Sequence, residues 1–275
     1  MRHWKHTALV FAALAVAGAI AAALVIATGV YNVAATEQHY APVYQALEGS
    51  MRASIKRRAQ NVVVPAIDDP AQIDAGLMLY RKHCAQCHGA PGVSPEPFAL
   101  GLNPQPANLA YTARTWSAQE LYWVIATGIR MTGMPAWRHR FTESETWAVV
   151  AFLKRLPYLA PDIYAELESR AEPASPQDVR HDAPDAKRGQ AALHQYACIT
   201  CHEIPGVVGA TVPVGPPLAR LATRRLIAGM LPNTEDNLVR WLRQPREINP
   251  RTAMPDLGVS EADARDIAAF LYTLK

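Results

Sequence analysis

The sequence predicts an all-α protein in which an N-terminal transmembrane helix precedes two tandem helical domains of the same kind. Three observations predict it. An apolar run free of charged residues extends from Thr7 to Val30. An internal repeat gives the rest of the chain two similar halves. Apolar residues recur at helical spacing, and no alternating run is long enough to indicate a substantial sheet.

The first element is the apolar run TALVFAALAVAGAIAAALVIATGV, at residues 7–30. As a helix it would reach about 36 Å, which is enough to cross a hydrocarbon core of about 30 Å. A cleaved secretory signal is the alternative, with Val33-Ala34-Ala35 as its cleavage site. The apolar region of a signal usually runs roughly 7–15 residues, so we favour a retained anchor over residues 1–35. Arg2 and Lys5 precede the run and are expected to stay in the cytoplasm, which places the rest of the chain outside it.

The next segment, residues 36–69, contains an amphipathic helical pattern. One face carries apolar residues at helical spacing, namely Tyr44, Leu47, Met51 and Ile55, and cations cluster from Arg52 to Arg58. Two interpretations stay open: a helix lying on the membrane surface with its cations near lipid phosphates, or a helix packing on the domain that follows.

The two halves of the remaining chain repeat each other. GLMLYRKHCAQCH at residues 76–88 matches GQAALHQYACITCH at 189–202, which has one extra residue. TGMPAW (132–137) corresponds to TAMPDL (252–257), and FTESETWAVVAFLKRL (141–156) aligns with VSEADARDIAAFLYTL (259–274). The last pair predicts two helices, with Thr142 or Ser144 as N-cap of one and Ser260 of the other. We therefore expect one domain at 70–156 and a second at 187–275, joined by a proline-rich linker at 157–186 that contains a short helix at 163–169.

All four cysteines of the chain lie in two Cys-x-x-Cys-His strings. These are Cys84, Cys87 and His88 in the first half and Cys198, Cys201 and His202 in the second. A Cys-x-x-Cys pair alone could be a disulfide, a redox dithiol or half a zinc site, but the histidine that closes both strings indicates c-type haem attachment. On a helical turn the two cysteines share a face, within reach of the two vinyl groups of one haem. The histidine follows directly and can bind the iron. The sequence thus predicts two covalently bound haems c.

Each half also offers a methionine as the second axial ligand of the iron. Met134 and Met254 lie in the matching TGMPAW and TAMPDL strings. A thioether is a soft neutral ligand that raises the reduction potential. Met131 and His139 are the alternatives to Met134, and Met230 is the alternative to Met254.

These motifs resemble the small helical domain of the cytochrome c family. In that family a glycine and an aromatic residue of the first helix pack across the last helix. Gly76 with Tyr80, and Gly189 with Leu193 or Tyr196, occupy those places here. The resemblance therefore implies close crossings of the first and last helix in both halves.

The family's Gly-Pro-x-Leu string is present only in the second half, as Gly215-Pro216-Pro217-Leu218. The resemblance implies that a proline carbonyl in this string accepts the N–H of His202. The nearest stretch in the first half, residues 104–109, has a different sequence, and the partner of His88 stays open.

An anchor with two such domains resembles the membrane-bound dihaem cytochrome c subunits of bacterial respiratory and dehydrogenase complexes. The resemblance implies a single-pass protein of the bacterial inner membrane with its haem domains in the periplasm. It also implies electron transfer without enzymatic activity, from a dehydrogenase or quinol-oxidising complex towards a terminal oxidase. Iron with both axial positions filled has no site for substrate. A dihaem cytochrome c peroxidase is the alternative and would need one haem able to lose its distal ligand. A haem-based gas sensor is a third.

The charge of the chain indicates no nucleic-acid partner. Lys and Arg number 27 against 24 Asp and Glu, a net charge of +3 in 275 residues. A nucleic-acid-binding surface usually shows a strong basic excess.

Overall fold

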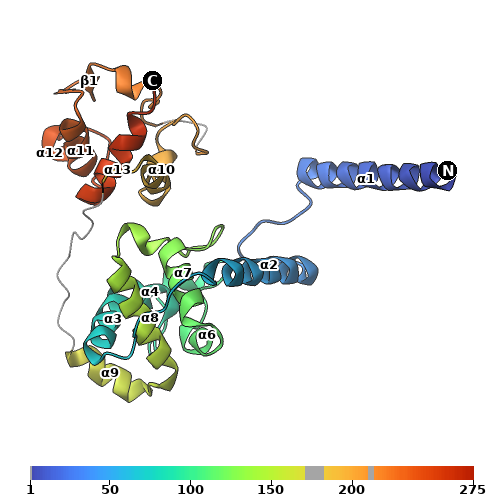
Figure 1. Ribbon diagram of the computed structural model, residues 1–275, viewed down its shortest axis with the longest axis horizontal. Helices are drawn as coiled ribbons and strands as arrows, with labels where there is room; N and C mark the ends of the chain where they lie inside the picture. Colours follow the sequence, from blue (N-terminus) through green and yellow to red (C-terminus); the bar gives the residue numbers. More distant parts are fainter. Residues whose placement is uncertain (1, 171–182, 210–213) are drawn as a thin grey trace.

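The structure, a computed structural model, describes residues 2–170, 183–209 and 214–275 (Figure 1). Almost all of its regular elements are helices, and the strands among the described residues are two short ones that form a hairpin. The predicted all-α class is confirmed. The first two helices are α1 (Arg2–Thr28), which covers the apolar run, and α2 (Ala41–Ala59). Residues 6–28 of α1 are long and apolar enough to cross a membrane and are not covered by the rest of the chain.

The first of the two repeated units is built around the helices α3 and α8. Its elements are α3 (Pro70–His83), α4 (Ala85–His88), α5 (Pro97–Leu100), α6 (Leu109–Thr115), α7 (Ala118–Thr127), η1 (Trp137–His139), α8 (Glu143–Arg155), η2 (Leu156–Tyr158) and α9 (Pro161–Arg170). Thr142 caps α8, where a reciprocal pair of hydrogen bonds joins it to Glu145. This capping box satisfies two backbone donors that a helix start leaves free.

The second unit repeats this plan with α10 and α13. Its elements are α10 (Ala186–Gln195), η3 (Cys198–Thr200), η4 (Leu221–Thr223), β1 (Leu226–Ile227), β2 (Leu231–Pro232), α11 (Glu235–Arg243), α12 (Pro245–Ile248) and α13 (Glu261–Leu271). Strands β1 and β2 pair antiparallel, with Ile227 opposite Leu231. Ser260 caps α13, as the repeat predicts.

Each unit is organised by a close crossing of its first and last helix at a glycine. A Cβ added to Gly76 of α3 would lie 1.9 Å from the carbonyl oxygen of Ala148 in α8. A Cβ added to Gly189 of α10 would lie at the same distance from the carbonyl oxygen of Asp266 in α13. Ala148 and Asp266 align in the repeat, so the two crossings are equivalent. No residue other than glycine fits at either place.

The second crossing carries an ion pair that has no counterpart among the described residues of the first. The guanidinium of Arg188 donates to both carboxylate oxygens of Asp266, at 2.8 and 2.9 Å. The carboxylate is almost fully buried, and the backbone N–H of Asp185 also donates to it. A bidentate pair of this kind fixes both position and orientation.

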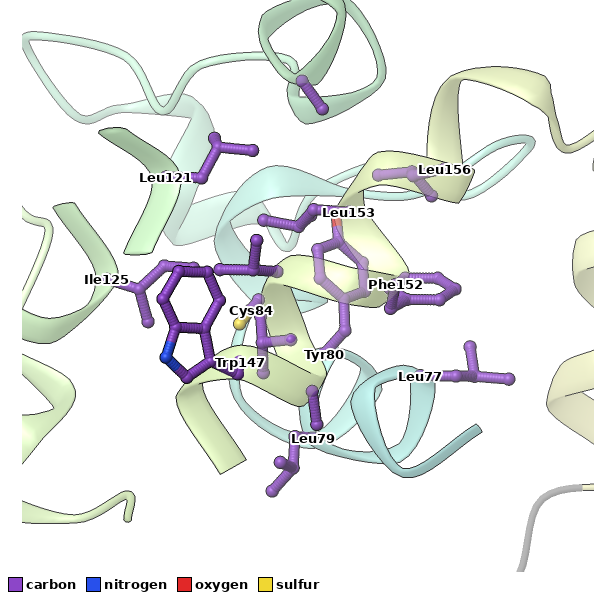
Figure 2. Close-up of a cluster of buried hydrophobic side chains, with 14 of the residues drawn as sticks. Leu77, Leu79, Tyr80, Cys84, Leu121, Ile125, Trp147, Phe152, Leu153 and Leu156 are labelled. Carbon is purple, nitrogen blue, oxygen red and sulfur yellow. The ribbon is translucent and has the colours of Figure 1, made fainter. Parts of the chain in front are cut away.

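The core of the first unit gathers on the α3–α8 crossing. Figure 2 shows Tyr80, Phe152, Leu153 and Trp147 in this cluster, with Cys84 among them. The Tyr80 hydroxyl donates to the Gly89 carbonyl at 2.5 Å, and its ring lies 5.2 Å from that of Phe152. The second unit has a separate core that includes Leu193, Tyr196, Leu238 and Ile267. Each unit therefore has its own apolar interior, as expected of a domain.

Helix α2 packs on the first unit through its C-terminal half. Ile55 and Ala59 are buried, and the Arg52 guanidinium lies 5.4 Å from the centre of the Trp116 ring. Tyr44 and Leu47, on the same face but nearer the N-terminus, are exposed. Of the two interpretations, packing on the following domain thus applies to one half of the helix.

The predicted linker begins with residues that belong to the first unit. Helix α9 covers the short helix expected at 163–169, and its Tyr164 is buried in the core of the first unit. Residues 171–182, the middle of that linker, lie outside the described residues.

The helix crossing makes a prediction for stability. Gly76→Ala should lower the free energy of unfolding of the first unit by about 3 kcal/mol, because the added methyl forces α3 away from α8. Gly189→Ala should do the same to the second unit. Gly49→Ala, in an open stretch of α2 with nothing within 4 Å, is the matched control and should change it by about 1 kcal/mol or less. Chemical denaturation followed by circular dichroism measures all three, and equal effects at positions 76 and 49 would contradict the close crossing.

Candidate haem sites

The first Cys-x-x-Cys-His string forms a single helical turn directly after α3. The N–H of His88 donates to the Cys84 carbonyl at 2.9 Å, and the N–H of Cys84 donates to that of Tyr80 at 2.8 Å. The turn thus continues the helix that carries Gly76 and Tyr80. All four cysteines of the chain are free.

The second string forms the same turn despite the extra residue before it. The N–H of His202 donates to the Cys198 carbonyl at 3.0 Å. The extra residue, Ala197, adopts a left-handed backbone conformation with φ of 54°. This conformation is rare for residues with a Cβ. This residue separates the end of α10 from the turn that begins at Cys198, so the insertion leaves the turn from Cys198 to His202 intact.

Both histidine rings are held by a backbone carbonyl. Nδ1 of His202 lies 2.8 Å from the Pro216 carbonyl oxygen, the partner that the Gly-Pro-x-Leu resemblance implied. Nδ1 of His88 lies 2.7 Å from the Ala107 carbonyl oxygen, within the stretch 104–109 that differs from that string. A carbonyl can only accept, so Nδ1 carries the proton in both rings and donates it. Nε2 is then left with a lone pair and can bind a metal.

Glycine brings the second carbonyl loop against its histidine. A Cβ added to Gly215 would lie 2.5 Å from Cε1 of the His202 ring and 2.8 Å from its Nδ1. The backbone therefore passes directly over the ring, which explains a glycine next to Pro216. In the first unit, Asn108 next to Ala107 caps α6 by accepting from the N–H of Tyr111. In this unit a helix cap, and not a glycine, therefore places the Ala107 carbonyl that contacts His88.

The two methionines lie in equivalent turns. The N–H of Met134 donates to the Thr132 hydroxyl oxygen at 3.1 Å, and that of Met254 to the Thr252 hydroxyl oxygen at 3.2 Å. Both methionine side chains are partly buried against the core of their unit. The threonine two residues before each methionine is a positioning residue that we did not single out from the sequence, although its signal, Thr-x-Met in both repeats, is present there.

The competing ligands are placed differently. Met131 is 92% exposed and Met230 is 50% exposed. His139 is buried, and its Nδ1 lies 3.8 Å from Oδ1 of Asp263 in the second unit. These positions favour Met134 and Met254 as the candidate sulfur ligands.

The two units touch at a small contact next to the second attachment turn. Arg140, directly after His139, places its guanidinium 4.9 Å from the centre of the Tyr196 ring. The Tyr196 hydroxyl donates to Oδ2 of Asp263 at 2.8 Å, and burial together with this carboxylate raises the pKa of Tyr196 to about 12. Asp263 is fully buried. The contact therefore joins the end of η1 in the first unit to a residue only two positions before Cys198.

Burial also affects the thiols. It raises the pKa of Cys84 to about 12 and that of Cys198 to about 11. In both strings, the first cysteine faces the apolar core. Burial likewise lowers the pKa of His88, opposed by its hydrogen bond to the Ala107 carbonyl, so the ring stays neutral and available as a metal ligand.

The residues of each unit fit one haem c. A pair of cysteine thiols on one turn, an imidazole with its Nδ1 proton held by a carbonyl, and a partly buried thioether match the donors that such a group requires. The held Nδ1 proton argues most directly for a metal at Nε2, because this arrangement orients the ring and raises its basicity.

Comparison with known families identifies both units. Residues 71–153 match the family described as cytochrome c oxidase, cbb3-type, subunit III, and residues 186–275 match the family described as cytochrome c. The fold and these matches define a class: electron-transfer haemoproteins that bind haem c covalently. Within this class, the chain is a c-type cytochrome with two cytochrome c domains in tandem and an N-terminal candidate membrane helix.

Individual relatives match only part of the chain. Cytochrome c oxidase subunit 2 of Alkalihalophilus pseudofirmus is 33% identical over 91 residues, 33% of this chain and 26% of that protein. The protein of the same name from Bacillus sp. (strain PS3) is 37% identical over 96 residues, 34% of this chain and 27% of that protein. The chain thus spans about a quarter of the length of these relatives.

A solved structure, a reducing HAO-like protein complex of Kuenenia stuttgartiensis, aligns over 78% of this chain and 99% of the matched chain. Its identity is 20% and its TM-score is 0.29. That similarity is too low to support an argument about fold or function.

The tight approach at His202 makes a prediction. Gly215→Ala should push the Pro216 carbonyl away from the His202 ring, because the added methyl has no room. The Nδ1–H of His202, detected by ¹⁵N-edited NMR, should then exchange with water at least tenfold faster. The His88 Nδ1–H, held by Ala107, is the internal control and should not change. An unaltered exchange rate of the His202 Nδ1–H would contradict the close approach of Gly215 to the ring.

Proposed function

We propose that the chain relays electrons through two covalently attached haems c. In this proposal they come from a dehydrogenase or quinol-oxidising complex and pass towards a terminal oxidase, at the periplasmic face of a bacterial inner membrane. The observation that carries the proposal is the duplication of a complete donor set. Each unit presents the Cys-x-x-Cys-His turn, a carbonyl-held histidine and a methionine in a Thr-x-Met turn.

The roles of the residues follow from their chemistry. The thiols of Cys84 and Cys87, and of Cys198 and Cys201, attach one haem in each unit. His88 and His202 would bind the iron through Nε2, with Nδ1 protonated and donating to its carbonyl. Met134 and Met254 would each supply a thioether ligand to the iron, which favours the ferrous state. A haem c bound in this way supplies an iron that alternates between the ferric and ferrous states.

The contact between the units supports a relay. Arg140 and Tyr196 bring the segment that follows Met134 against the segment that precedes Cys198. A linked pair of domains gains a high effective concentration, so even a small contact can be populated. The units are therefore expected to exchange electrons with each other within one chain.

Two features support the membrane setting and the kind of partner. The candidate membrane helix, residues 6–28, would anchor the chain with the haem units outside the cytoplasm. Both matched relatives are named as a subunit of cytochrome c oxidase, and the family matched by the first unit is an oxidase subunit as well. We infer from this that an oxidase is the acceptor.

The haem count tests the proposal. Replacing Cys84 and Cys87 by serine should halve haem staining per chain in denaturing gels, because the first attachment site is lost. The same change at Cys198 and Cys201 is the matched variant and should also halve the staining. A variant with all four cysteines replaced by serine should show no haem staining. Full staining after either double change would refute two attachment sites.

The methionine assignment is tested by spectroscopy. Met134→Ala should remove about half of the sulfur-to-iron charge-transfer absorption in the far red of the ferric protein, and Met254→Ala the other half. Met131→Ala is the control: its exposed side chain predicts no change. Loss of the band in Met131→Ala with no loss in Met134→Ala would show that Met131, and not Met134, is the ligand.

A further inference from the structure

The segment between α1 and α2, residues 29–40, folds back on itself. The Tyr31 hydroxyl lies 2.6 Å from Nδ1 of His39, and its ring meets that of Tyr40 edge to face at 5.8 Å. Tyr31 is three residues beyond the end of α1, and Tyr40 is the N-cap of α2. Twelve extended residues could separate the two helices by about 40 Å. The tyrosine contacts instead keep the start of α2 next to the end of α1.

The same segment is tied to the loop that holds His88. The side-chain amide of Asn103 donates to the carbonyl oxygens of Ala35 and Glu37, at 3.2 and 2.9 Å. Asn103 lies between α5 and α6, four residues before Ala107, whose carbonyl accepts from His88. A chain of contacts therefore connects the end of α1 to the candidate haem site of the first unit.

Helix α2 carries one apolar face along its whole length, but only half of it is covered. Near the C-terminus, Ile55 is 3% exposed against the first unit. Near the N-terminus, Tyr44 and Leu47 are each 55% exposed. Figure 1 shows α2 extending beyond the other helices of the first unit. Tyr40, at the cap, is exposed as well.

We propose that the exposed N-terminal half of α2 lies in the headgroup region of the bilayer, and that α2, the folded segment 29–40 and Asn103 together form a mount. This mount holds the first haem unit at the membrane surface with its His88 loop on the membrane side. The inference rests on the proposed function in two respects, namely that α1 is a membrane anchor and that each unit carries a covalently attached haem.

Lipid is the occupant that the observations favour. The start of α2 is held within side-chain contact of Tyr31, close to where α1 would leave the bilayer. Tyrosine is enriched at membrane interfaces because its ring is apolar and its hydroxyl is polar. The exposed apolar face consists of a few side chains, far less than the roughly 800 Å² that each partner buries in a stable protein interface.

The attachment should not depend on charge. In the exposed half of α2, residues 41–51, Glu48 is the one charged residue, and it is paired with Arg52 at 2.6 Å. The cations Lys56 and Arg57 lie in the half that packs on the first unit. Insertion of apolar side chains, unlike attraction to lipid phosphates, is not screened by salt.

The mount assigns different partners to the two units. A protein embedded in the bilayer would exchange electrons with the first unit, which is held beside it. The second unit, joined through the predicted linker, would serve the other partner.

Spin labels on the full-length, haem-loaded protein test the contact with lipid. Leu47→Cys and Gln45→Cys place one label on the apolar face and a matched one about 200° around the helix; the four native cysteines are held by haem and do not react. The measurement uses vesicles of phosphatidylcholine and phosphatidylglycerol, and it gives for each label the ratio of its collision rate with oxygen to that with a water-soluble nickel chelate. This ratio should be at least fivefold higher at position 47 than at position 45, in low salt and in 1 M salt alike.

The other outcomes separate the inference from the anchor. Equal, water-like accessibility at both positions in protein that floats with the vesicles would overturn the inference and leave the anchor intact. Protection of position 47 from both oxygen and chelate would overturn it in favour of contact with a second copy. Failure to float with vesicles would overturn both the anchor and the mount.

A second measurement tests the mount itself. A label on Glu37→Cys should give the broad spectrum of an immobilised side chain. Asn103→Ala should narrow this spectrum, because the two hydrogen bonds to the segment are lost, while haem staining stays complete. Gln105→Ala, in the same loop, is the matched control and should leave the spectrum broad. An equally broad spectrum in Asn103→Ala would show that Asn103 does not hold the segment.

Discussion

The organisation of each unit depends on one steric constraint, the absence of a side chain where the first helix crosses the last. Gly76 and Gly189 let a backbone carbonyl of α8 or α13 approach to a distance that a methyl group would exclude. Because the helix that carries the glycine continues into, or lies just before, the Cys-x-x-Cys-His turn, the crossing also sets where that turn lies relative to the core. Tyr80 and Tyr196 then connect the same helices to buried polar partners, Gly89 in one unit and Asp263 in the other.

Both repeats have this crossing, but the residue of the last helix that faces the glycine differs between the two units. In the first, Ala148 faces the glycine and the surroundings are apolar. In the second, Asp266 takes the equivalent place and binds Arg188. Breaking a buried pair of this kind by removing one partner usually costs much more than the pair contributes. Replacing Arg188 or Asp266 alone is therefore expected to destabilise the second unit in a way that has no counterpart at Ala148 of the first.

Much of this architecture could be predicted from the sequence. The apolar run, the repeated strings and the helical periodicity are local signals, and they led to the all-α class, the helix caps at Thr142 and Ser260, and the candidate ligands. The Pro216 carbonyl followed from a family resemblance. The Ala107 carbonyl did not, because any residue supplies a carbonyl and its side chain therefore gives no signal. Likewise, nothing in the sequence showed that Ala197 takes up the extra residue, since alanine rarely adopts a left-handed conformation, or that Tyr164 joins the core of the first unit.

The carbonyl that orients each histidine has a consequence for how such a duplicated protein can diverge. The hydrogen bond is a property of the backbone path, so the loop that provides it is free to change its side chains as long as that path is kept. In one unit the path depends on glycine and proline, and in the other on the cap of a short helix. Two copies that began alike could thus drift apart in this loop without losing the histidine tautomer that carries its proton on Nδ1. Each copy could in this way acquire its own solvent exposure and electrostatic surroundings while the orientation of its histidine stayed the same.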